Sequence, residues 1–113
     1  MRLRNAGLAG AMTCALVLGM AWASAPAHAQ DAKITIDNFA FTPAEITVST
    51  GTTVSWVNRD DIPHTITDAA DPREFKSSPL DTGDGFTHVF SKPGTYHYFC
   101  SLHPHMQGTV VVK

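Results

Sequence analysis

The 113-residue sequence has only two cysteines, Cys14 and Cys100, and it has no cluster of basic residues. It carries eight Lys and Arg residues against ten Asp and Glu residues. Nucleic acids and anionic membrane surfaces attract proteins with clustered Lys and Arg. We therefore expect no nucleic-acid partner and no membrane partner.

Long hydrophobic runs are also scarce, and the main one lies near the N-terminus. Arg2 and Arg4 give a positive start, residues 6–20 are apolar, and residues 25–29 supply small residues in an A-x-A pattern. This order is typical of a secretory signal peptide, here cleaved after Ala29. The apolar part is rich in Ala and Gly and falls short of the about 20 residues that a membrane span needs. We predict a signal peptide over residues 1–29, one domain over 30–113, and a periplasmic location.

Cleavage would leave Cys100 as the single cysteine of a mildly acidic domain of 84 residues. Small exported domains usually pair their cysteines to gain stability. With one cysteine, no internal disulfide can form. A free thiol in an oxidising compartment is open to oxidation unless it is buried or bound to a metal.

The remaining chain alternates polar and apolar residues with a period of two, and no segment has a helical period. A long irregular connection over residues 69–85 interrupts the pattern; loops of this length are usually functional or mobile. Short strands separated by turn residues are typical of an antiparallel sandwich or barrel, so we predict an all-β fold of seven or eight strands. The predicted strands cover residues 33–37, 39–43, 45–48, 53–58, 65–68, 86–90, 95–100 and 109–112.

Four side chains of metal-binding type stand at informative positions. Cys100, His103 and Met106 follow one another at steps of three along one loop, and His64 lies at a distant junction between a loop and a strand. A thiolate and two imidazoles with a weak thioether form the ligand set of blue copper. Zinc also binds Cys and His, but the thioether favours copper because methionine is a poor zinc ligand.

Each of these residues has a simpler interpretation when it is taken alone. A lone cysteine on a strand is more often a small core residue than a ligand. His103 and His105 form an H-x-H pair of the kind that multicopper oxidases use, but those enzymes need several such pairs. We interpret His105 as a solvent-facing loop residue, and His88 and His97 as ordinary strand residues.

The motif Cys100-x-x-His103-x-x-Met106, followed by Gly108 and a valine strand, resembles the cupredoxin family. The segment of residues 54–59 that leads to His64 resembles the same family. Within that family the short ligand loop is most similar to amicyanin and plastocyanin-like small copper proteins. The resemblance implies a Greek-key antiparallel β-sandwich with one type 1 copper ion. Tyr96, four residues before Cys100, resembles the buried corner tyrosine of these sandwiches. The implied copper ligands are His64, Cys100, His103 and Met106.

Two residues depart from the family pattern. Thr65 stands where the family often has Asn, whose side chain ties the two ligand loops together, and a threonine hydroxyl can do a weaker version of this. Leu102 stands where amicyanins commonly have Pro, and it restores a backbone N–H that proline lacks. We hypothesise that this N–H points at the Cys100 sulfur, which would favour Cu(I).

The expected function is that of an electron carrier, not an enzyme, that cycles between Cu(II) and Cu(I). A copper-binding protein for trafficking or resistance is the alternative. An oxidase or nitrite reductase is disfavoured because 84 residues leave no room for a second catalytic copper. We expect a monomer that meets redox partner proteins transiently, through an apolar patch of Phe99, Pro104 and Met106 around His103.

Overall fold

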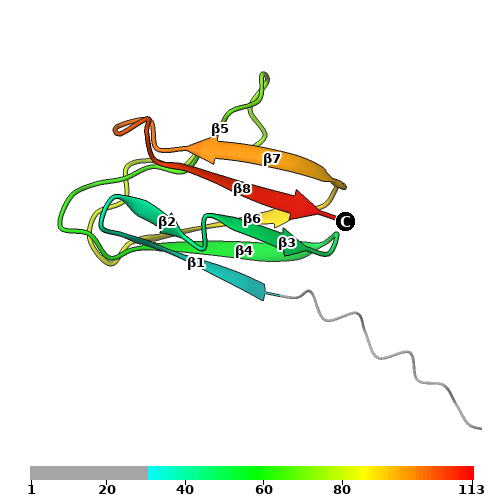
Figure 1. The fold of residues 1–113 in the computed structure, drawn as a ribbon, viewed down its shortest axis with the longest axis horizontal. Coiled ribbons are helices and arrows are strands. Elements are labelled where there is room, and N and C mark those ends of the chain that lie inside the picture. Colours follow the sequence, from blue (N-terminus) through cyan, green and yellow to red (C-terminus); the bar gives the residue numbers. More distant parts are fainter. Residues whose placement is uncertain (1–30) are drawn as a thin grey trace, which may run out of the picture.

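The computed structural model describes residues 31–113, and the predicted signal peptide over residues 1–29 lies outside them. The described chain is a sandwich of two four-stranded sheets (Figure 1), with strand orders β2-β1-β4-β6 and β3-β8-β7-β5. Within residues 31–113, no helix has the length and apolar character to cross a membrane. The strands are β1 (Asp31–Asp37), β2 (Ala40–Thr42), β3 (Glu45–Val48), β4 (Thr52–Asn58), β5 (Thr67–Asp68), β6 (Gly85–Phe90), β7 (Gly94–Phe99) and β8 (Gln107–Val112).

The predicted all-β sandwich is confirmed, and each predicted strand corresponds to an observed one. The pairing is less uniform than the predicted antiparallel arrangement, because β1 pairs with β4 in parallel and β3 pairs with β8 in parallel. Parallel neighbours need a crossover connection. For β1 and β4 the crossover is residues 40–48, which form β2 beside β1 and then β3 in the opposite sheet.

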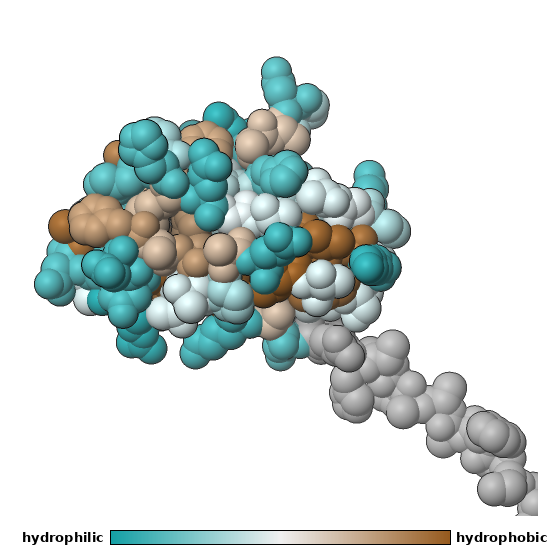
Figure 2. All heavy atoms as spheres, in the orientation of Figure 1, coloured by the Kyte–Doolittle hydropathy of each residue, from teal (hydrophilic) through white to brown (hydrophobic). Residues whose placement is uncertain are grey.

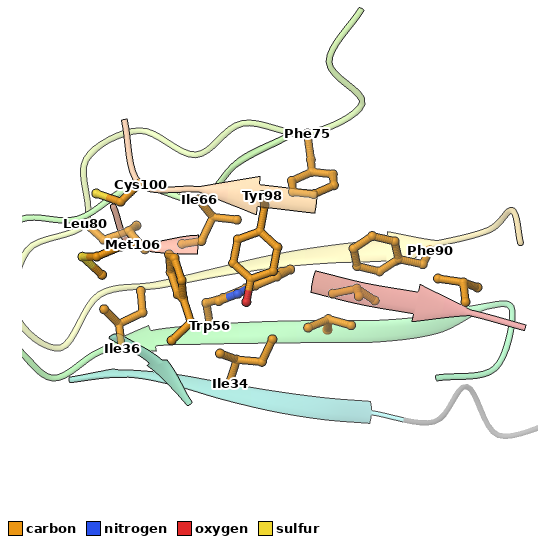
Figure 3. Packing of buried hydrophobic residues seen from close by; sticks show 14 residues of the cluster. Ile34, Ile36, Trp56, Ile66, Phe75, Leu80, Phe90, Tyr98, Cys100 and Met106 are labelled. Carbon is orange, nitrogen blue, oxygen red and sulfur yellow. The ribbon is translucent and has the colours of Figure 1, made fainter. Parts of the chain in front are cut away.

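Trp56 on β4 lies at the centre of the core between the sheets (Figure 3), and its side chain is fully buried. The alternation of β4 buries every second residue from Thr52 to Asn58, which is why Trp56 points inward. Its ring packs edge-on against Tyr98 from the other sheet, at 5.4 Å between centroids. Contacts between aromatic rings add to the energy of burial, so this pair joins the two layers.

The long connection after β5 is packed along the segment that contains His64. His64 and Leu80 exchange two backbone hydrogen bonds, and Ser77 N–H donates to the Ile66 carbonyl at 2.8 Å. The side-chain hydroxyl of Ser77 accepts from Ile66 N–H at 2.9 Å. The connection therefore acts as an edge partner that fixes residues 64–68.

The two tyrosines of β7 differ in burial. Tyr96 is half-buried, and its hydroxyl donates to the Lys92 carbonyl at 2.8 Å, four residues upstream. This is the bond of a tyrosine corner, although the ring is less buried than the resemblance implied. Tyr98 is the fully buried one. A Cβ added to Gly108 would lie 2.2 Å from the Tyr98 ring, so this position in β8 accepts only glycine.

Within residues 31–113, the hydroxyl of Tyr98 has no hydrogen-bond partner, and neither has the indole N–H of Trp56. Figure 3 shows the nitrogen of Trp56 beside the oxygen of Tyr98. Burial raises the pKa of Tyr98 to about 12, and the nearby indole N–H offsets only part of this rise. The folded state therefore holds this proton at pH values where the unfolded chain has lost it.

We predict that the metal-free protein loses stability as the pH rises from about 10 to about 12, by up to about 1.4 kcal/mol per pH unit. Tyr98→Phe should remove most of this loss, since the variant has no buried phenol to ionise. Urea unfolding at several alkaline pH values measures it. Tyr96→Phe is the matched control and should keep most of the loss; equal slopes for the wild type and Tyr98→Phe would contradict the prediction.

Candidate metal centre

The site lies at one end of the sandwich, where the turn between β1 and β2, the loop after β4 and the loop before β8 meet (Figure 1). The C-terminus lies at the opposite end. Figure 3 shows the sulfur atoms of Cys100 and Met106 together at the site end of the core. The candidate ligands therefore lie at one end of the packed core and contact it.

His64 is fully buried, and both of its ring nitrogens face polar groups. Nε2 lies 2.7 Å from Asp60 Oδ2. Since a carboxylate accepts hydrogen bonds, Nε2 carries the proton in the neutral ring and Nδ1 keeps a free lone pair. That Nδ1 lies 3.7 Å from the Cys100 sulfur. The ring is thus oriented to offer Nδ1 to an ion beside the thiol.

Cys100 follows the last residue of β7 and is fully buried. Backbone hydrogen bonds close the loop after it: Cys100 N–H donates to the Met106 carbonyl, and Met106 N–H donates to the His103 carbonyl. These bonds are 3.1 and 2.9 Å long. The short interval from Cys100 to Met106 therefore forms one compact turn that presents three candidate ligands.

His103 is the partly exposed member of the set. Its Nδ1 lies 3.7 Å from the Cys100 sulfur, and its ring centroid is 5.0 Å from that of His64. The ligand atoms of His64, Cys100 and His103 all lie within 4.8 Å of one another. Met106 is buried at the same end of the core. The structure thus brings together the four residues that the sequence singled out.

The donor set fits a copper ion. A metal ion of zinc's size, with bonds of about 2.0 Å to imidazole nitrogen and about 2.3 Å to thiolate sulfur at a trigonal angle, would hold nitrogen and sulfur about 3.7 Å apart. Both imidazole nitrogens lie at this distance from the thiol. Two imidazoles, one thiolate and a thioether are typical of type 1 copper.

Thr65 ties the two ligand loops together, as its position in the sequence predicts. Its hydroxyl accepts from Ser101 N–H at 2.8 Å and shares a second hydrogen bond with the Ser101 hydroxyl, also at 2.8 Å. A third bond, of 3.1 Å, joins it to the hydroxyl of Thr67. This small network does the work that the family often assigns to an asparagine side chain.

The hypothesis that Leu102 N–H points at the Cys100 sulfur is wrong. Among the described residues, the backbone N–H that reaches this sulfur is that of Thr65, at 3.4 Å. The turn directs His103 N–H to the Cys100 carbonyl at 3.2 Å. It leaves Leu102 at the surface, with 48% of the residue exposed. The electron density of the thiol is therefore influenced from the His64 loop, not from Leu102.

The predicted apolar patch also differs in its members. Met106 is buried, and the guanidinium of Arg73 lies over the ring of Phe99 at 5.9 Å. The exposed large apolar residues near the site are Leu102 and Phe39, at 48% and 52% exposure, while Pro104 is exposed as predicted. Figure 2 shows brown and tan atoms at the end of the molecule where the β1–β2 turn lies.

Phe39 was not singled out in the sequence, yet it contacts both histidines of the site. Its ring meets that of His64 edge-on at 5.6 Å and that of His103 edge-on at 5.3 Å. Asn38 and Phe39 both have positive φ angles, of 52° and 59°. The sequence does not predict such a turn at Asn38 and Phe39, because residues other than glycine rarely have positive φ angles.

Asp60 was also missed, although it lies only four residues before His64. Burial raises the pKa of its carboxyl, but hydrogen bonds from Phe39 N–H, the His64 ring and Asn38 N–H outweigh this and lower the pKa below its ordinary value. Asp60 is therefore negatively charged. The local sequence Asp60-Asp61 gave no means of telling which carboxylate faces the histidine.

The other histidines of residues 31–113 are not part of the ligand cluster. His105 is exposed, as predicted, and His97 is exposed on β7 with Nδ1 3.2 Å from the Thr109 hydroxyl. His88 is half-buried on β6, where its ring packs against Phe75 and Phe90. The interpretation of His88 and His97 as strand residues is confirmed.

Comparison with known proteins gives one family. Residues 10–112 match the cupredoxin-like domain. The chain is 31% identical over 104 residues to amicyanin-alpha of Methylorubrum extorquens, which covers 89% of this chain and 87% of that protein. It is 31% identical over 87 residues to the plastocyanin of Scenedesmus fuscus, covering 65% and 86%. Among solved structures, a purple cupredoxin from Nitrosopumilus maritimus has a TM-score of 0.69 at 39% identity, covering 74% of this chain and 100% of that one.

We predict that Thr65→Val destabilises the metal-free protein by about 1–3 kcal/mol, because it leaves the partly buried Ser101 N–H without an acceptor. Hydrogen exchange at Ser101 N–H should become faster. Urea unfolding and amide exchange measure the two effects. Thr67→Val is the matched control, since the Thr67 hydroxyl contacts only that of Thr65 in this network; equal Ser101 exchange in both variants would refute the assignment.

Proposed function

This chain belongs to the cupredoxin family, and we propose that it is a periplasmic electron carrier with His64, Cys100, His103 and Met106 as the ligands of one type 1 copper ion. When bound, copper supplies the Cu(II)/Cu(I) couple. The chain's relatives reported above carry the names amicyanin and plastocyanin, not those of enzymes, in agreement with the expectation that this chain is not an enzyme.

The observation that carries the proposal is the unequal burial of two similar ligands. His64 is fully buried, whereas His103 is partly exposed, and both rings offer Nδ1 at 3.7 Å from the same thiol. His103 thus joins the interior of the site to the surface. An electron carrier needs such a path, because its partner must approach the site without opening it.

The surface around His103 supports transient docking. Phe39 and Leu102 are exposed, and Phe39 contacts the His103 ring directly. A small apolar surface of this kind favours brief contact with a partner that needs rapid release, since weak redox complexes have small interfaces. We propose that redox partners dock over Phe39, Leu102 and His103.

Copper trafficking is less favoured by the same geometry. A cargo protein must release its metal to an acceptor, which requires ligands that the acceptor can reach. Here Cys100, His64 and Met106 are buried, and hydrogen bonds tie the two ligand loops together. The site is built to retain an ion while its charge changes.

The periplasmic location is part of the proposal and rests on the sequence of residues 1–29. A positive start, an apolar segment and an A-x-A pattern favour export and cleavage after Ala29. Expression of the full chain in a Gram-negative host, followed by N-terminal sequencing of the periplasmic fraction, tests it. We expect a mature protein that begins at Gln30; an uncleaved cytoplasmic product would contradict the proposal.

We predict an intense visible absorption for the Cu(II)-loaded protein, from charge transfer between thiolate and copper. Cys100→Ser should abolish the band, because the thiolate is its donor. Met106→Ala should shift the band without removing it, because a thioether would be a weaker ligand than the thiolate. A colourless Cu(II) form of the wild type, or a band that survives in Cys100→Ser, would rule out the site as proposed.

We predict that Leu102→Asp slows electron self-exchange between two copies by about tenfold, or roughly 1.4 kcal/mol, because like charges meet where the apolar surfaces should touch. Val89→Asp is the matched control. Val89 is 50% exposed and pairs with Thr53 at the start of β4, the end of the sandwich away from the site. Equal slowing in both variants would argue against docking over Leu102.

A further inference from the structure

Asp60 is the acceptor at which three donors from two separate segments converge. Its Oδ1 accepts from Asn38 N–H at 2.6 Å, and its Oδ2 accepts from Phe39 N–H at 2.9 Å and lies 2.7 Å from His64 Nε2. The carboxylate is mostly buried, with 11% of the side chain exposed. A single charged group therefore connects the β1–β2 turn to a candidate metal ligand.

The backbone of Asp60 is held as firmly as its side chain. Asp60 N–H donates to the Asn58 side-chain oxygen at 2.9 Å, and the Asp60 carbonyl accepts from the Thr82 hydroxyl. The Asn58 side-chain amide in turn donates to the carbonyls of Ile62 and Leu80. Because Asn58 ends β4, the position of the carboxylate is fixed by the sheet and not by a free loop.

We propose that Asp60 is a positioning residue for the copper site, which orients His64 and, through its negative charge, lowers the reduction potential of the ion. This inference rests on the proposed function, since it requires copper at His64 Nδ1. Asp60 contacts Nε2 of the His64 ring, while the Nδ1 of the same ring faces the Cys100 sulfur.

The direction of the effect follows from charge. A carboxylate that accepts from the far nitrogen of a ligating imidazole raises the basicity of that ligand. A nearby negative charge stabilises the more positive of two states, which is Cu(II). Removing the charge should therefore weaken Cu(II) binding more than Cu(I) binding. The reduction potential should then rise with the logarithm of the ratio between the two changes in dissociation constant.

A purely structural role for Asp60 makes a different prediction. The Asn38–Phe39 turn has positive φ angles, and the two backbone N–H bonds to Asp60 hold it in place. If Asp60 served only to hold this turn, its loss would lower stability and displace the Phe39 ring. Removal of the ring alone would then reproduce any change in potential.

The test compares Asp60→Asn with Asp61→Asn and Phe39→Ala in the copper-loaded protein. Asp61→Asn removes the same charge from the adjacent, exposed residue. Phe39→Ala removes the ring and keeps the backbone N–H. Reduction potentials are measured by titration with a redox mediator, and dissociation constants for Cu(II) and Cu(I) by competition with chelators.

For Asp60→Asn we expect the Cu(II) dissociation constant to rise by about tenfold more than that of Cu(I), within the 10–100-fold range of losses at residues that support metal ligands. A tenfold ratio corresponds to about 59 mV for one electron. Asp61→Asn and Phe39→Ala should shift the potential by much less. If Asp60→Asn matches Asp61→Asn, or if Phe39→Ala gives the same shift, the inference is overturned.

A wild-type protein without the thiolate-to-copper band would overturn the proposed function, and this inference with it. A wild type with that band and an unshifted Asp60→Asn would overturn the inference alone. If Asp60→Asn does not fold, NMR of the wild-type Cu(I) protein decides. The Nε2–H proton of His64 should exchange slowly with water because Asp60 accepts it, and a rapidly exchanging proton would refute the assignment.

Discussion

The contact between Thr65 and the Cys100–Ser101 segment is the constraint on which the site depends. Two loops that are 36 residues apart in the sequence meet there, through Thr65 N–H on the Cys100 sulfur and Ser101 N–H on the Thr65 hydroxyl. Thr65 N–H is buried and Ser101 N–H is partly buried, and leaving such a group without a partner is costly. The same two bonds set the distance between the His64 ring and the thiol, so the fold and the ligand geometry have a common origin.

The site is asymmetric around that contact. On the interior side, His64 is fully buried and held by Asp60, whose own backbone is fixed by Asn58 at the end of β4. On the surface side, His103 is partly exposed beneath Phe39 and close to Leu102. In the proposed carrier, one half of the site keeps the ligand geometry constant while the other half meets the partner.

Much of the fold was predictable from the sequence because strands bury alternate residues, and a period of two is visible in β4 and β7 without any tertiary information. The ligand loop was predictable because Cys100, His103 and Met106 are close in the chain and chemically distinctive. The parallel pairings of β1 with β4 and β3 with β8 were not, since local patterns do not report which strands become neighbours. Phe39 was missed for the same reason, because its contacts with Asp60 and His64 cross 21 or more residues. Asp60 was missed because the sequence does not tell which of the two adjacent aspartates faces His64. The expected Leu102 bond failed because the direction of a backbone N–H depends on how the turn closes.

The most direct test of the account is copper K-edge X-ray absorption on the loaded protein, since it counts the atoms around the ion. We expect one short bond to sulfur and two bonds to imidazole nitrogen. Cys100, His64 and His103 would supply these three atoms, and the thioether of Met106 would contribute more weakly. A shell of nitrogen and oxygen atoms without a short sulfur would contradict it.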